Sequence, residues 1–179
     1  MGEAKNREAH LRARIVAELE KHMVPTWPAE EQLVDEIRAL QFYECRRVPD
    51  HQLDYMRMEP QKCHVNAAAY VNLDPTGTSW HQGGWWKRNG VFYFHSVILT
   101  GEGKLRCVTP HPDRSVLQFA PDDEVDWSTI IDGARHPRRH GLEVPILVRD
   151  EPDKVIAQAT EARDRILAGE RLEDIRVPF

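Results

Sequence analysis

The chain has 179 residues, of which 41% are hydrophobic and 30% are charged, and its formal net charge at pH 7 is −5. A chain of this length can bury a hydrophobic core without a metal or a disulfide, and an odd count of three cysteines argues against a disulfide framework. The acidic charge excludes the electrostatic footprint of a nucleic-acid-binding domain, and no apolar stretch is long enough to cross a bilayer.

The first residues of the chain indicate where the protein resides. Residues 1–19 are charged and amphipathic and lack the apolar core of a signal peptide. We therefore expect a cytoplasmic protein, with secretion by a signal-independent route left open. The expected partner is a peptide or protein substrate, with no nucleic acid, no membrane and no cofactor; the oligomeric state is not predicted.

Hydrophobic periodicity predicts helices at both ends of the chain and strands between them. Helical spacing is found at residues 5–23, 28–40 and 152–168, and strand patterns at residues 42–45, 91–99, 104–110, 116–119 and 144–148. These elements predict an α+β fold, in which a cysteine-bearing helix packs on an antiparallel sheet beside two N-terminal helices and a C-terminal helix. We expect one domain over residues 1–179, with residues 1–40 as an N-terminal helical extension.

Cys63 lies where a central helix is expected to begin. Pro60 suits the first turn of a helix, and the alanines at residues 67–69 favour its continuation. Unpaired backbone N–H groups, the helix dipole and the nearby charge of Lys62 would then make the thiol more acidic than a free cysteine. The alternative is that Cys63 is a small buried hydrophobic residue.

His95 lies in the middle of an apolar strand that follows a hairpin signal, Asn89-Gly90. Both faces of residues 91–99 are apolar, which is typical of a central strand. An ionisable ring in such a strand is either a core histidine whose hydrogen bonds are satisfied or a catalytic base.

The next strand supplies candidates for a group that orients His95. If residues 101–103 form a three-residue loop, Thr100 pairs with Lys104, Val97 with Cys107 and His95 with Thr109. A four-residue loop would instead place Val108 opposite His95. In the first register Thr109 and His111 lie on the His95 side, with Asp113 and Asp122 further along the chain.

A cysteine at a helix start, followed by a strand histidine and an orienting residue on the next strand, resembles the papain-like superfamily, including NlpC-type peptidases and transglutaminase-like proteins. The resemblance covers residues 58–111 and implies that Cys63 attacks a carbonyl carbon while His95 acts as base and then acid. Cys107, Thr109 or His111 stands where an Asp or Asn is common. Gln61 is too close to Cys63 to match the family's oxyanion glutamine, and the backbone N–H of Cys63 can serve instead.

Two further features are interpreted from their residue types. Trp85 and Trp86, next to Gly83 and Gly84, can wall a substrate groove or cap a sheet edge. The acidic residues around Asp122 are expected to mark a helix N-terminus.

We predict a cysteine-dependent hydrolase or acyltransferase that acts on an amide bond as a peptidase, deamidase or transglutaminase-like enzyme. Its expected catalytic residues are Cys63, His95, His111 and Thr109. Two alternatives are a zinc-binding protein using Cys63, His95, Cys107 and His111, and a non-catalytic interaction protein.

Overall fold

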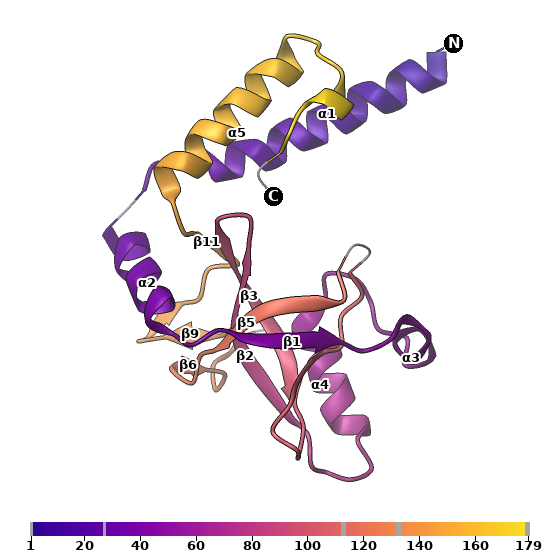
Figure 1. The fold of residues 1–179 in the computed structure, drawn as a ribbon, viewed down its shortest axis with the longest axis vertical. Coiled ribbons are helices and arrows are strands. Elements are labelled where there is room, and N and C mark those ends of the chain that lie inside the picture. Colours follow the sequence, from indigo (N-terminus) through magenta and orange to yellow (C-terminus); the bar gives the residue numbers. More distant parts are fainter. Residues whose placement is uncertain (1, 27, 112–113, 132–133, 178–179) are drawn as a thin grey trace. The chain divides into compact units, whose positions relative to one another are not determined.

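The computed structural model describes residues 2–26, 28–111, 114–131 and 134–177, and its fold is α+β, as predicted (Figure 1). The α-helices are α1 (Gly2–His22), α2 (Pro28–Ala39), α3 (Asp50–Tyr55), α4 (Cys63–Leu73) and α5 (Pro152–Leu167), and a 3₁₀ helix covers Leu172–Asp174. Both N-terminal helices, the helix that begins at Cys63 and the C-terminal helix are therefore confirmed.

The main sheet contains β1 (Tyr43–Arg47), β2 (Trp80–Arg88), β3 (Val91–Leu99), β4 (Leu105–Cys107), β5 (Val116–Pro121) and β11 (Leu147–Arg149). Its strand order is β11-β3-β2-β5-β1-β4, and an additional β3–β4 pairing closes β3, β2, β5, β1 and β4 into a ring. The pairs β1–β5, β2–β5 and β3–β4 are antiparallel, as predicted, whereas β1 and β4 are parallel. Parallel strands need a long connection, and here it carries α3, α4, β2 and β3.

Short strands form two smaller sheets. One contains β6 (Val125–Asp126), β9 (Arg138–Arg139) and β10 (Leu142–Glu143), and the other pairs β7 (Ile130–Ile131) with β8 (Ala134–Arg135).

Two tight turns position the strand that carries His95. Asn89 and Gly90 have φ angles of 49° and 77°, the left-handed conformations that a two-residue hairpin turn requires, so the predicted turn before β3 is confirmed. After β3, Leu99 pairs with Leu105 and Ile98 with Arg106, and the Thr100 N–H donates to the Lys104 carbonyl. This is the register of the three-residue loop, and it excludes the four-residue alternative.

The two faces of β3 contact different parts of the core. Val97 belongs to a cluster inside the ring of strands, with Cys45, Trp86, Cys107, Leu117 and Phe119. Ile98 belongs to a second cluster, with Ala67 of α4 and with Val48, Leu53, Met58 and Val108. Because side chains alternate along a strand, His95 shares the face of Val97, and Ser96 shares the face that α4 covers.

The chain separates into two compact units, one of Met1–Val34, Asn89–Val91 and Arg149–Phe179, the other of Asp35–Arg88 and Phe92–Val148. In the first unit α1 and α5 lie side by side (Figure 1), and Leu19 packs against Ala159, Ala162 and Ile166. The buried guanidinium of Arg149 binds the Glu30 carboxylate at 2.6 Å and the His22 carbonyl at 2.9 Å. The expectation of a single domain with residues 1–40 as an extension stays a prediction.

The prediction for Asp122 is wrong. This residue does not begin a helix; it follows β5, is 2% exposed and precedes the short strand β6. Its carboxylate accepts hydrogen bonds from the Trp85 indole N–H at 2.8 Å and from Arg139 Nε at 2.9 Å. Two buried donors, rather than a helix dipole, account for an acidic side chain here.

Among the helices in the described part of the chain, none combines the length and the apolar character needed to span a membrane.

Candidate functional site

Cys63 is the first residue of α4, and its thiol is half-buried. Backbone N–H groups of Ser96, His64 and Cys63 itself are directed at the sulfur, but burial has the larger effect and raises the pKa of the thiol. The nearby Lys62 ammonium is paired with the Glu59 carboxylate at 2.6 Å. The expectation that Cys63 is more acidic than a free cysteine is therefore wrong, because desolvation of the thiolate outweighs the hydrogen bonds that favour it.

His95 is buried, at 4% exposure, on the inner face of β3. Its Nε2 lies 3.4 Å from the sulfur of Cys107, and burial lowers its pKa to about 3. The Cys107 thiol can also donate to the Thr109 carbonyl, at 3.7 Å. When the thiol proton is used in that way, Nε2 donates to the sulfur and Nδ1 keeps the lone pair that a general base needs.

The backbone N–H of Ser96 is directed at the thiol of Cys63. The thiol therefore lies beside the peptide unit that joins His95 to Ser96. No hydrogen bond joins this thiol to the His95 imidazole among the residues that the structure describes. Cys63 on α4 is thus close to the backbone of β3, and the sulfur in hydrogen-bond contact with the His95 ring belongs to Cys107.

Thr109 and His111 occupy different environments. Thr109 is 1% exposed, and its hydroxyl oxygen accepts from Asn66 Nδ2 at 3.3 Å. Asn66 also donates to the Glu59 carbonyl and accepts from the Glu59 N–H, so Thr109 helps to anchor the first turn of α4. His111 is half-buried, and its ring centroid lies 5.6 Å from that of His95. Asp113 lies outside the described residues.

A second hydrogen-bonded group, not anticipated from the sequence, lies on the α4 side of β3. The Ser96 hydroxyl lies 2.6 Å from His64 Nδ1 and 2.7 Å from His81 Nε2. Both imidazoles contact the ring of Trp127, and burial together with the charge of His81 lowers the pKa of His64 to about 4. Strand alternation places Ser96 opposite His95, but the approach of Trp127 has no local signal in the sequence.

Trp85 and Trp86 are buried, at 0% and 6% exposure. Trp85 donates to Asp122, whereas the ring of Trp86 lies 5.7 Å from the ring of His95 and 4.9 Å from that of His111. Trp86 thus forms a wall of the histidine pair, and contact of either tryptophan with a substrate stays a prediction.

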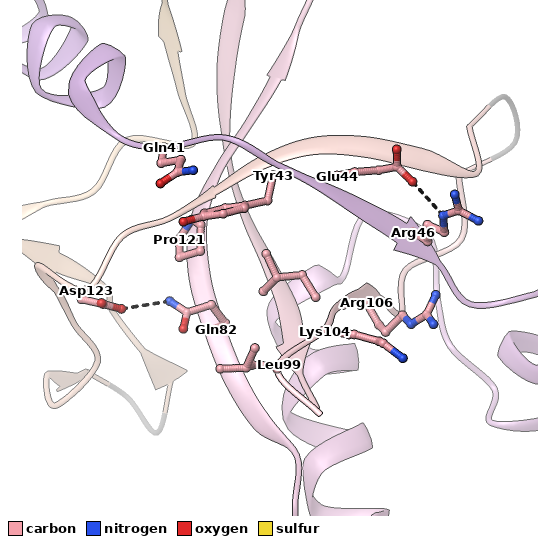
Figure 2. A pocket seen from close by; sticks show the side chains of 12 residues that line it. Gln41, Tyr43, Glu44, Arg46, Gln82, Leu99, Lys104, Arg106, Pro121 and Asp123 are labelled. Carbon is pink, nitrogen blue, oxygen red and sulfur yellow. Dashed lines mark hydrogen bonds and ion pairs between the residues drawn. The ribbon is translucent and has the colours of Figure 1, made fainter. Parts of the chain in front are cut away.

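A cavity of about 890 Å³ opens in the unit that contains the sheet (Figure 2). Its lining carries both signs of charge, with Arg46 bound to Glu44 and Asp123 bound to Gln82. None of the site residues predicted from the sequence lines this cavity. The cavity and the cysteine–histidine cluster are therefore separate features of the unit.

A scan against protein-family models gave no match to the chain, and searches of curated proteins and of solved structures gave none either.

Proposed function

We propose that the protein is a cysteine-dependent hydrolase or acyltransferase that acts on an amide bond of a peptide or protein. The observation that carries this proposal is the position of the Cys63 thiol, at the start of α4 and close to the backbone N–H of Ser96, the residue that follows His95. It brings a helix-terminal sulfur next to the backbone of the strand that carries His95, in the chain order of the papain-like superfamily. We also propose a cytoplasmic location.

The resting pair in this proposal is a neutral thiol and a neutral imidazole. Burial raises the pKa of Cys63 and lowers that of His95 to about 3, so neither group is charged near pH 7. The proton must then leave the sulfur as the substrate is attacked. This makes His95 a general base of the attack step rather than the partner of a preformed thiolate.

The reaction needs two transfers of the acyl group, the first to Cys63 and the second to water or an amine. The Cys63 sulfur bonds to the carbonyl carbon while its proton passes to His95 Nδ1, and the backbone N–H of Cys63 donates to the developing oxyanion. His95 then gives the proton to the departing amine, which leaves a thioester on Cys63. Water or a second amine attacks the thioester and loses a proton to His95, which restores the thiol; peptide hydrolysis, deamidation and acyl transfer share these steps.

The test is transfer of an acetyl group from p-nitrophenyl acetate to the intact protein, with the modified residue located by mass spectrometry. We expect Cys63 to be acetylated at least tenfold faster than Cys45 or Cys107. The variant His95→Gln should slow this reaction about 100-fold, the lower range for a general base. The variant Cys45→Ser, which alters a buried thiol elsewhere in the sheet, is the matched control and should leave the Cys63 rate unchanged.

Thermal unfolding of each variant separates loss of chemistry from loss of fold, since His95 is buried. The variant Cys63→Ser provides a second comparison, because it keeps the size of the side chain and should abolish the rapid acetylation. Equal rates at the three cysteines of the folded wild-type chain would overturn the proposal, as would an unchanged Cys63 rate in folded His95→Gln.

A further inference from the structure

Three side chains that can bind a metal converge inside the ring of strands. His95 on β3, Cys107 at the end of β4 and His111 four residues later each offer one ligand atom, and these atoms lie within 4.8 Å of one another. Within the described part of the chain, this group does not include Cys63. The arrangement therefore differs from the four-ligand set that the sequence analysis gave as an alternative.

The spacing of the three donor atoms is close to that of a tetrahedral metal site. Bonds of about 2.0–2.3 Å at tetrahedral angles place neighbouring ligand atoms about 3.4 Å apart. His95 Nε2 and Cys107 Sγ already have this separation, at 3.4 Å. The remaining contacts need to close by no more than about 1.4 Å, which a small rotation of the half-buried His111 ring can supply.

The ligand types and their surroundings select the kind of metal. Two imidazoles and one thiolate suit Zn²⁺ and related borderline metals, whereas Mg²⁺ and Ca²⁺ require oxygen ligands. The rings of Trp86 and Phe119 pack against His95, at centroid distances of 5.7 and 6.3 Å. These apolar rings limit hydration around the ligands. The lower local dielectric constant strengthens the attraction between a metal ion and the Cys107 thiolate.

We propose that His95, Cys107 and His111 form a three-ligand Zn²⁺ site whose fourth position is filled by water or by an exogenous ligand. Binding displaces the Cys107 thiol proton to solvent and joins the sulfur and one nitrogen of each imidazole to the metal. Coordination of Zn²⁺ at His95 Nε2 leaves the ring proton on Nδ1, the atom that has to accept the Cys63 proton, so Zn²⁺ inhibits the transfer of acyl groups to Cys63. Only this inhibition rests on the proposed function; the metal site itself does not.

Co²⁺ is the probe that tests the site, because it replaces Zn²⁺ and a Co²⁺–thiolate bond gives a charge-transfer absorption in the near ultraviolet. Titration of the intact, metal-free chain should give this absorption with one Co²⁺ per chain, and Zn²⁺ should bleach it. The variant Cys107→Ser should abolish the absorption, and His111→Gln should weaken Co²⁺ binding at least tenfold. The variants Cys45→Ser and Cys63→Ser are matched controls that should keep both the absorption and the affinity.

Absence of stoichiometric Co²⁺ in the folded wild-type chain would overturn the site, and so would an absorption that persists in Cys107→Ser or disappears in Cys63→Ser. Acetylation of Cys63 is then measured with and without Zn²⁺. Normal acetylation of the Zn²⁺-loaded chain would overturn the inhibition alone. Slow acetylation in the absence of metal would instead count against the hydrolase, whatever the Co²⁺ spectrum shows.

Discussion

The Nε2 atom of His95 lies 3.4 Å from the sulfur of Cys107, and this contact orients the imidazole at the centre of the sheet. Cys107 occupies the last position of β4 and is 0% exposed. Burial raises the pKa of its thiol to about 11, so the group that fixes the ring is a neutral thiol at pH 7 rather than a carboxylate. His95 consequently gains no negative partner that would raise its basicity, and its pKa is lowered to about 3.

The reactivity of Cys63 should increase with pH without an early plateau. Because burial raises the pKa of this thiol, its thiolate fraction should rise about tenfold per pH unit from pH 6 to pH 8. The rate of alkylation by iodoacetamide, resolved by residue with mass spectrometry, measures this fraction. A rate that is already constant between pH 6 and pH 8 would show a preformed thiolate and contradict the neutral resting pair.

The stability of the protein should fall in mild acid in part because of His64. Its pKa is lowered from 6.5 to about 4 in the folded state, so between these values the unfolded chain binds more protons than the folded one. Stability is therefore lost as the pH falls below about 6.5, and the share of His64 between pH 7 and pH 5 is about 1–2 kcal/mol. Urea unfolding at both pH values should show a correspondingly smaller loss in His64→Gln.

The matched control for this prediction is His51, an exposed histidine of α3. The variant His51→Gln should keep the pH dependence of the wild-type chain. An identical pH dependence in His64→Gln would mean that the His64 ring titrates equally in the folded and unfolded states.

Removal of the Asp122 carboxylate should strongly destabilise the sheet-containing unit. Asp122→Ala leaves the Arg139 guanidinium, at 8% exposure, without this partner and leaves the buried Trp85 N–H without its acceptor. Breaking a buried pair in this way costs about 3–5 kcal/mol. Chemical denaturation measures the loss, and the exposed neighbour change Glu124→Ala should stay within about 0.5 kcal/mol of wild type.

A methyl group at Gly84 should disturb the pairing of β2 with β5. A Cβ built on Gly84 would lie 2.1 Å from the Ala120 carbonyl oxygen and 2.8 Å from Phe119 Cζ, so the backbone of the neighbouring strand would have to move. We expect Gly84→Ala to cost about 2 kcal/mol or more in unfolding free energy.

Gly83→Ala is the matched control for that change. Its Cβ would meet the Trp127 ring at 3.0 Å, and a side chain can shift more easily than a strand. The loss of stability should therefore be smaller than for Gly84→Ala; the reverse order would contradict the argument from backbone contact.

Local sequence signals predicted the elements around the site because their causes are local. The first turn of α4 follows Pro60, the left-handed pair Asn89-Gly90 sets the turn before β3, and the three-residue loop after Thr100 sets the register with β4. That register correctly places Cys107 on the strand adjacent to His95, whereas β4 ends at Cys107 and Thr109 follows it outside the strand. It does not say which side chain the imidazole contacts, since ring orientation depends on packing inside the sheet.

The sequence by itself determined the α+β class, the helix that begins at Cys63 and the strand position of His95, since these depend on periodicity and turn residues within short segments. Only the tertiary structure decided that β1 and β4 run parallel, that Asp122 is buried against Arg139, and that Cys107 contacts His95. These contacts join residues that are 12 to 60 positions apart in the sequence. Several strands and helices bury them together, so no short segment of the sequence predicts them. Desolvation likewise depends on the assembled core, which is why the shift in the pKa of Cys63 opposes the one that its helix position predicts.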